Sequence, residues 1–218
     1  MVLDRDAGVH VKRTGCWAVA VFFYCILPCH RLWFDFYLLA RPVHYLGKTM
    51  LNITIRSEQP DDIDAIAWVT KTAFAPEQFA SHTEQFIVNA LRRTNQLAIS
   101  LVALYEGTIV GHIAISPVSI SSGASGWYGL GPVSVLPQWQ GQGVGTQLIR
   151  LGLDQLQRSG ARGCVVLGDP QFYGRFGFKA NCSLLYAHAP ARYFQALAFA
   201  GEIPCGQVSF HEAFEATQ

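Results

Sequence analysis

The chain from Ile53 onward changes its hydrophobic period several times, and each period predicts a different element. Apolar and polar residues alternate over Ile53–Arg56, which predicts a first strand. Apolar residues then recur every three or four positions after Pro60 and again over Glu84–Arg93, which predicts two helices. The acidic residues that follow Pro60 suit the positive end of a helix dipole. This part of the chain therefore begins with a strand and two helices.

Two further alternating runs, Leu97–Tyr105 and Thr108–Ser116, predict a hairpin around the Glu106-Gly107 turn. A polar loop over 119–126 separates this hairpin from a buried strand at Leu130–Leu136. A long helix over Val144–Arg158 follows.

The last third of the chain begins with a strand-like run at Cys164–Leu167 and a short helical segment behind it. Later short strands are expected near Leu184–Ala187 and Gln207–Phe210, and Phe194–Phe199 is interpreted as core or interface packing. The predicted order is β-α-α-β-β-β-α-β-α-β, which indicates an α/β fold.

A glycine-rich turn joins the Leu130–Leu136 strand to the long helix. The first N–H groups of a helix have no intrahelical acceptor, and the helix dipole adds positive charge there, so such a turn is suited to a phosphate. Gly141, Gly143 and Gly145 lack the Cβ atoms that would hold a phosphate away from the backbone. Dinucleotide-binding folds and P-loops use similar turns. A P-loop, however, ends in Gly-Lys-Ser/Thr, and a Rossmann turn lies in the first βαβ unit of its domain.

A second motif, Gly168-Asp-Pro-Gln-Phe-Tyr-Gly-Arg-Phe-Gly-Phe178, follows the Cys164–Leu167 strand. Asp169 is expected to cap a helix that begins at Pro170, and Gly177 is expected to end it. Tyr173 lies in the middle of this helix of about two turns.

The two motifs together resemble those of the GNAT (GCN5-related N-acetyltransferase) superfamily. Gln140-x-x-Gly143-x-Gly145 is similar to its Q/R-x-x-G-x-G/A signature, and Tyr173 with Gly177 and Phe178 is similar to its Y-x-x-x-G-F segment. The whole second motif resembles a subgroup of small bacterial GNAT proteins. The resemblance implies a GNAT fold, with a mixed central sheet and flanking helices, over about Ile53 to Phe210.

The resemblance also implies a cosubstrate, acetyl-CoA, and no metal. Its pyrophosphate would lie at the turn, and the backbone of the preceding strand would meet the pantetheine and the thioester oxygen. Tyr173 would protonate the departing thiolate, although a purely structural tyrosine is the alternative. The cofactor-binding residues implied are Val133, Ser134, Val135, Gln140, Gly141, Gln142, Gly143, Val144, Gly145 and Thr146.

The general base is not identified, because Leu130–Leu136 contains no carboxylate. His112 is a candidate that would act through water, and a structural histidine is the alternative. Arg175 suits either a phosphate of coenzyme A or a surface ion pair. The expected function is acetyl transfer to a primary amine of a small molecule, protein or peptide. The alternative is a non-catalytic acyl-CoA-binding or regulatory module, which would not need Tyr173.

Composition is consistent with one domain: 218 residues, 50% of them hydrophobic and 14% charged, can bury one substantial core. The net charge of +1 gives no electrostatic case for a nucleic-acid partner. The six cysteines form no CxxC pair, which indicates free thiols and a cytoplasmic protein.

Residues 1–49 differ from the rest of the chain: they hold six Lys/Arg and three Asp/Glu, against ten and twelve in residues 50–218. Their longest apolar run has eleven residues, short of the roughly 20 that span a bilayer. Lys12 and Arg13 precede it as in a signal peptide, but no small-x-small cleavage site follows. We expect residues 1–49 to be an extension outside a GNAT domain at 50–218. Membrane association through residues 17–46 is the alternative, and a homodimer stays open.

Overall fold

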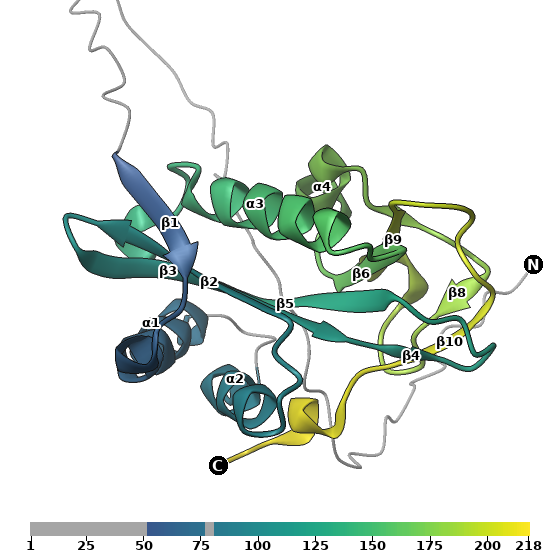
Figure 1. The fold of residues 1–218 in the computed structure, drawn as a ribbon, viewed down its shortest axis with the longest axis horizontal. Coiled ribbons are helices and arrows are strands. Elements are labelled where there is room, and N and C mark those ends of the chain that lie inside the picture. Colours follow the sequence, from purple (N-terminus) through teal and green to yellow (C-terminus); the bar gives the residue numbers. More distant parts are fainter. Residues whose placement is uncertain (1–51, 77–80) are drawn as a thin grey trace, which may run out of the picture.

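The computed structural model describes residues 52–76 and 81–218, and a seven-stranded sheet forms its centre (Figure 1). In spatial order the strands are β1 (Ile53–Ser57), β2 (Ile99–Tyr105), β3 (Thr108–Pro117), β5 (Trp127–Val135), β6 (Gly163–Leu167), β9 (Phe194–Ala198) and β7 (Lys179–Ala180). Neighbours run antiparallel, except that β5 and β6 run parallel. A parallel pair needs a crossover connection, and helix α3 (Val144–Arg158) provides it.

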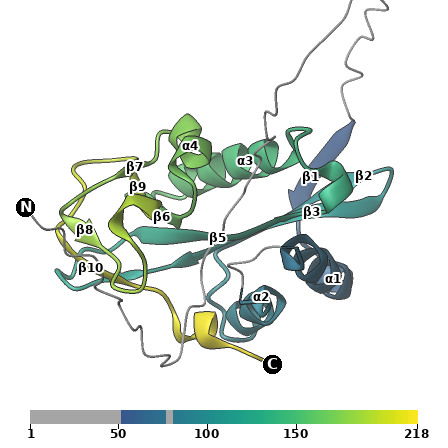
Figure 2. The ribbon, with the colours of Figure 1, turned by 180° about the vertical axis from the view of Figure 1, so that it is seen from behind.

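Helices cover both faces of this sheet. The first two, α1 (Ile63–Phe74) and α2 (Glu84–Arg93), lie on one face, while α3 and α4 (Pro170–Tyr173) lie on the opposite face (Figures 1 and 2). The three-to-four-residue repeat that predicted α3 forms its buried side, which includes Val144, Leu148, Ile149, Leu153 and Leu156.

A smaller sheet forms from strands β4 (Ser119–Ile120), β10 (Gly206–Ser209) and β8 (Leu184–Leu185), in the order β4-β10-β8. After β10, a 3₁₀ turn at Glu212–Glu215 packs its Phe214 against Ile87 and Leu91 of α2. The end of the chain therefore lies beside α2, as Figure 1 shows.

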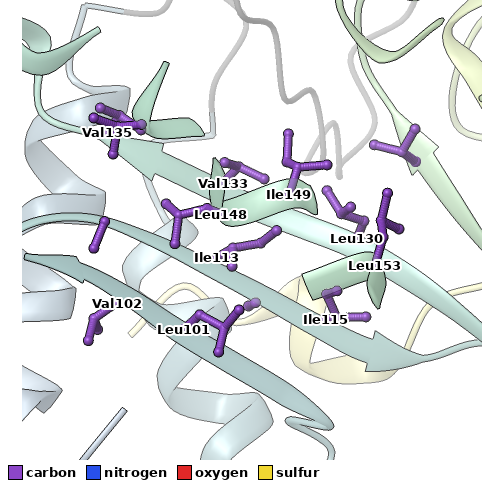
Figure 3. Packing of buried hydrophobic residues seen from close by; sticks show 14 of the residues in the cluster. Leu101, Val102, Ile113, Ile115, Leu130, Val133, Val135, Leu148, Ile149 and Leu153 are labelled. Atoms are coloured by element: carbon purple, nitrogen blue, oxygen red, sulfur yellow. The ribbon is translucent and has the colours of Figure 1, made fainter. Parts of the chain in front are cut away.

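The main core lies between α3 and the sheet (Figure 3). Ile113 of β3, Val133 of β5 and Leu148 of α3 are each at most 1% exposed. Burial of each such side chain stabilises the fold by about 1.5–3 kcal/mol. Gly152 brings α3 close to the sheet, because a Cβ there would lie 3.2 Å from the Ile115 side chain. This packing makes β3 and β5 a firm support for the residues described below.

The predicted α/β architecture is correct, and the predicted order of elements through α4 is confirmed with one exception. Strand β4, Ser119–Ile120, lies in the segment 119–126 that was predicted to be a loop. The later strands near Leu184–Ala187 and Gln207–Phe210 are β8 and β10, which belong to the smaller sheet. Phe194–Phe199 packs in a core as expected, but Phe194–Ala198 does so as strand β9 in the main sheet, which the sequence interpretation missed.

The predicted N-terminal extension, residues 1–49, lies outside the described residues, as do three of the cysteines, Cys16, Cys25 and Cys29. Among the helices of residues 52–76 and 81–218, none has the length and apolar character to cross a membrane.

Candidate active site

Strands β5 and β6 separate partway along their length. They pair from Trp127 and Gly163 to Leu130 and Val166, where the pairing stops. β5 then continues to Val135, and among the described strands only β3 pairs with this part of it. One edge of β5 is therefore unpaired over its last residues, next to the turn that leads into α3.

The backbone groups of Val133 and Val135 face this unpaired edge. Leu136 donates its N–H to the Val110 carbonyl at 3.0 Å, which makes the neighbouring Val135–Gly111 pair a non-hydrogen-bonded one. Hydrogen-bonded and non-hydrogen-bonded pairs alternate along an antiparallel ladder. The N–H and carbonyl of Val133 therefore point to the unpaired edge, as those of Val135 do, whereas those of Ser134 point toward β3. Ser134 was also predicted to bind the cofactor; its backbone faces β3, and its part in cofactor binding stays a prediction.

Two glutamine side chains hold the glycine turn in place. Gln140 Nε2 donates to the Val135 carbonyl at 3.0 Å, and Gln142 Nε2 donates to the Gln138 carbonyl at 2.7 Å. The Gln140 bond occupies the Val135 carbonyl on the unpaired edge of β5, which leaves the Val135 N–H and the backbone groups of Val133 facing that edge. The glutamine of the signature therefore fixes the shape of the turn.

The glycines of the turn open its surface to solvent. Gly141 and Gly143 have φ angles of 70° and 87°, and a Cβ at either would meet no atom of the described residues within 4 Å. Gly143 is the N-cap of α3 and has no capping side chain, and the first intrahelical bond runs from the Gln147 N–H to the Gly143 carbonyl at 3.0 Å. The N–H groups of the first turn therefore have no intrahelical acceptor and suit an anion.

A cavity of about 500 Å³ lies between this turn and α4. Val135 and every residue of the 140–146 turn line it on one side, and Asp169, Phe172 and Arg175 are among those on the other. The guanidinium of Arg175 lies 4.4 Å from the centre of the Phe172 ring, and its Nε donates to the Phe172 carbonyl at 3.1 Å. Arg175 forms no ion pair with any residue that the structure describes. The cavity thus joins a helix N-terminus to a positive side chain.

Helix α4 begins as the second motif predicts. The Asp169 carboxylate accepts a hydrogen bond from the Gln171 N–H at 3.0 Å, and Pro170 is the first helical residue. A 3₁₀ turn continues the helix to Gly177, whose φ of 93° ends it. This confirms the predicted helix and places Tyr173 within it.

Tyr173 is fully buried and does not line the cavity. Its ring packs against those of Phe172 and Phe178, with centroid distances of 5.0 and 6.0 Å. Its hydroxyl has no hydrogen-bond partner among the described residues. Burial raises the pKa of Tyr173, so the phenol keeps its proton at neutral pH. A tyrosine kept only for packing would normally have its hydroxyl paired, so the unpaired hydroxyl is compatible with a ligand acceptor.

His112 lies on β3 and is fully buried, away from the cavity. Its Nε2 lies 2.8 Å from the hydroxyl of Ser100, a residue that the sequence interpretation did not select. Ser100 in turn binds Glu58, which forms an ion pair with Arg92. Burial lowers the pKa of His112 to about 4, so the ring is neutral at neutral pH.

The burial of neutral His112 should make the stability of the protein depend on pH. We expect the free energy of unfolding to fall as the pH drops from about 6.5 to about 4, since the unfolded His112 takes up a proton near 6.5 and the folded one only near 4. The loss attributable to this residue reaches about 3 kcal/mol at the acid end. Urea denaturation at several pH values measures it. In the His112→Asn variant, the free energy of unfolding should depend less on pH over this range. An equal pH dependence in both proteins would contradict the lowered pKa of His112.

Comparison with known proteins agrees with this geometry. The family model for the acetyltransferase (GNAT) family matches residues 61–178, more than half of the chain. The chain therefore belongs to the GNAT acetyltransferase family.

Several GNAT proteins are similar to this chain in sequence or structure. A GNAT family acetyltransferase from Brucella melitensis, solved in complex with acetyl-CoA, is 50% identical, with a TM-score of 0.68 over 75% of this chain and 99% of that one. Escherichia coli YhbS, solved in complex with CoA, has a TM-score of 0.70 at 32% identity, covering 77% of this chain and 94% of that one. In sequence, YhbS of strain K12, described as an uncharacterized N-acetyltransferase, is 38% identical over 126 residues, which is 57% of this chain and 72% of YhbS.

Within residues 52–76 and 81–218, no three or more His, Cys, Asp or Glu side chains gather closely enough to hold a metal ion. The described cysteines are free thiols: Cys164 is buried, and Cys182 and Cys205 are exposed.

Proposed function

We propose that this chain transfers the acetyl group of acetyl-CoA to a primary amine of a small molecule, a protein or a peptide. The observation that carries the proposal is the separation of β5 from β6 beside a glycine turn with open N–H groups, on a chain of the GNAT family. Two similar proteins were solved with acetyl-CoA or CoA bound. The proposed site combines an anion position with an unpaired strand edge, which are the two features that a long phosphorylated thioester needs.

Each part of acetyl-CoA can be matched to a part of the site by its charge and its hydrogen-bonding groups. Its pyrophosphate would accept hydrogen bonds from the N–H groups of Gly143 to Thr146, and Arg175 supplies a nearby positive charge. Its pantetheine would lie along the unpaired edge of β5 and exchange hydrogen bonds with the Val133 backbone, as a further strand would. The thioester would then lie where β5 and β6 separate, between Leu130 and Val133.

The reaction requires a neutral amine, a polarised carbonyl and a proton for the departing thiolate. Positioning both substrates supplies much of the rate, and an N–H at the β5 edge would stabilise the developing oxyanion. Tyr173 would give the thiolate its proton, since its hydroxyl is protonated and has no hydrogen-bond partner in the part of the chain that the structure describes. This step requires that the bound cofactor reach the tyrosine, which is enclosed by its aromatic neighbours.

That enclosure favours one alternative, a non-catalytic acyl-CoA-binding or regulatory module. Such a module would keep the turn and the cavity and would not use the Tyr173 hydroxyl. Turnover distinguishes it from an enzyme, and binding does not.

We assign the proposed activity to residues 50–218, because every residue invoked lies there, and treat residues 1–49 as an extension. The free thiols support placing the protein in the cytoplasm.

The test uses the full chain and Met50–Gln218 side by side. We expect both to bind acetyl-CoA in calorimetric titrations and to release free thiol when pooled amines are added. Binding without thiol release for any amine class would favour the module. Failure of both proteins to bind acetyl-CoA would refute the proposed function, and failure of the shorter one alone would refute the domain assignment.

A further inference from the structure

A line of buried polar groups crosses the sheet on the face that carries α1 and α2. It starts on β5, where the Ser134 hydroxyl donates to Thr70 of α1 at 3.2 Å. It continues on β3 with His112, the cross-strand partner of Ser134, and on β2 with Ser100. Ser134, His112 and Thr70 are completely buried. A buried polar side chain destabilises the fold unless it forms hydrogen bonds, so a buried polar atom without a partner is a candidate for a role in function.

The far end of the line is charged. The carboxylate of Glu58, which follows β1, accepts hydrogen bonds from Arg92 at 2.7 and 2.8 Å and a further one from the Ser100 hydroxyl. Burial raises the pKa of Glu58, but the hydrogen bonds from Arg92 and Ser100 outweigh it and hold the pKa below its usual value. Glu58 is therefore an anion at neutral pH. It borders an open cavity of about 390 Å³ together with Arg92 and Ser100, so solvent reaches this end.

The charge on Glu58 fixes the tautomer of His112. An ionised carboxylate can only accept, so the single proton of Ser100 is used in the bond to Glu58. The Ser100 oxygen must then accept from His112, and the neutral ring carries its proton on Nε2. Nδ1 is left as a bare acceptor.

That acceptor has no partner. Nδ1 of His112 is buried and receives no hydrogen bond from any residue of 52–76 or 81–218. The hydrogen-bonding directions of the two ring nitrogens diverge widely in the plane of the imidazole. Because Nε2 points toward Ser100 on β2, Nδ1 points away from β2. The neighbouring hydroxyl on the other side is that of Ser134, whose residue forms a hydrogen-bonded cross-strand pair with His112, typically about 5.5 Å between Cα atoms. A turn of the Ser134 hydroxyl away from Thr70 would bring a donor toward Nδ1.

We propose that Ser134 and His112 form a proton relay that takes the proton of the attacking amine, with Ser100 and Glu58 as positioning residues that keep Nδ1 ready to accept it. This inference rests on the proposed acetyl transfer. Ser134 belongs to the part of β5 that has left β6, so its side chain is the member of the line nearest the site proposed for the thioester. The arrangement is similar to a catalytic triad, in which a hydroxyl, a histidine base and a carboxylate that orients the histidine act together. Here Ser100 bridges the Glu58 carboxylate and the His112 ring.

The amine nitrogen forms a bond to the acetyl carbon, and its proton passes to the Ser134 oxygen while the Ser134 proton passes to Nδ1. The carbon-sulfur bond breaks, and the thiolate takes a proton from Tyr173. The imidazolium, 3.9 Å from the Glu58 carboxylate, then loses its proton to solvent as the products leave, and the phenolate of Tyr173 regains one. Protons removed equal protons returned.

The first test is a direct observation of the ring. Nitrogen NMR of the imidazoles is expected to show neutral His112 with its proton on Nε2 in the wild type and a loss of that preference in Ser100→Ala. A wild-type ring with its proton on Nδ1 would overturn the proposal, whatever the activity.

The second test is kinetic. Ser134→Ala, Ser100→Ala and Glu58→Gln are expected to lower kcat by about tenfold or more while the KM and affinity for acetyl-CoA stay unchanged, and His112→Asn by about 100-fold or more. Asp62→Asn is the matched control, because it breaks another ion pair between β1 and the start of α1, Arg56 with Asp62, that does not touch His112. We expect Asp62→Asn to lose stability and keep kcat.

Three outcomes count against the relay. Folded Ser100→Ala and Glu58→Gln proteins that turn over as fast as Asp62→Asn would show that the line is structural. A wild type that binds acetyl-CoA and acetylates no amine would refute the proposed transfer and the relay together, whereas a slow Tyr173→Phe with a fast Ser134→Ala would refute the relay alone.

Discussion

Replacing Gly143 by valine is expected to weaken acetyl-CoA binding about 100-fold or more, equivalent to about 2.7 kcal/mol. A Cβ at this position meets no atom of the described part of the chain within 4 Å, so the new side chain projects into the open cavity. It would occupy the space in front of the first N–H groups of α3, where the pyrophosphate is proposed to lie. Calorimetric titration with acetyl-CoA measures the change.

The control for this substitution lies at the other end of the same helix. Gly160 has a φ of 84°, and a Cβ there also meets nothing within 4 Å, so Gly160→Val imposes the same backbone strain and the same absence of protein clashes. Both variants should therefore lose similar stability in thermal melts, and only Gly143→Val should lose the cofactor. Equal affinities in the two folded variants would remove the turn from the binding site.

Hydrophobic periodicity predicted the fold well where elements are long and each has one buried face. The repeat over Val144–Arg158 coincides with α3, and the cap and stop residues around α4 lie where the motif placed them. Strand β9 was missed because Phe194–Ala198 joins the sheet between β6 and β7, covered on both faces, so its residues do not alternate in polarity. Its pairing with β6 spans about 30 residues of sequence, and nothing local encodes it.

The motifs also predicted the cofactor side of the site, because a glycine turn at a helix N-terminus is a local feature. The line from Glu58 to His112 could not be predicted, since it depends on strand register. A two-residue turn pairs Tyr105 with Thr108, and an unbroken ladder would then place His112 opposite Leu101. An irregularity after Ala103 shifts the register by one, so His112 pairs with Val102 and shares the face of Ser100. A single extra residue in β3 thus decides which partners the histidine has.

Tyr173→Phe is expected to lower kcat by about 10- to 10⁴-fold while leaving the affinity for acetyl-CoA unchanged. The variant removes only the hydroxyl, which is buried and has no hydrogen-bond partner among residues 52–76 and 81–218. Because an unpaired buried polar group is unfavourable, the same change should raise the free energy of unfolding, by about 1 kcal/mol. Turnover under saturating acetyl-CoA, followed by thiol release, and urea denaturation measure the two effects.

A loss of rate together with a gain in stability separates the two interpretations of this tyrosine. A hydroxyl that serves only the fold would, when removed, change stability and leave kcat as it was. Tyr128→Phe is the control, since Tyr128 lies on β5 where β5 still pairs with β6, before the strands separate. It should change neither kcat nor cofactor affinity. If Tyr173→Phe turned over like Tyr128→Phe, the thiolate would have to take its proton from another group or from solvent, and Tyr173 would be a packing residue of α4.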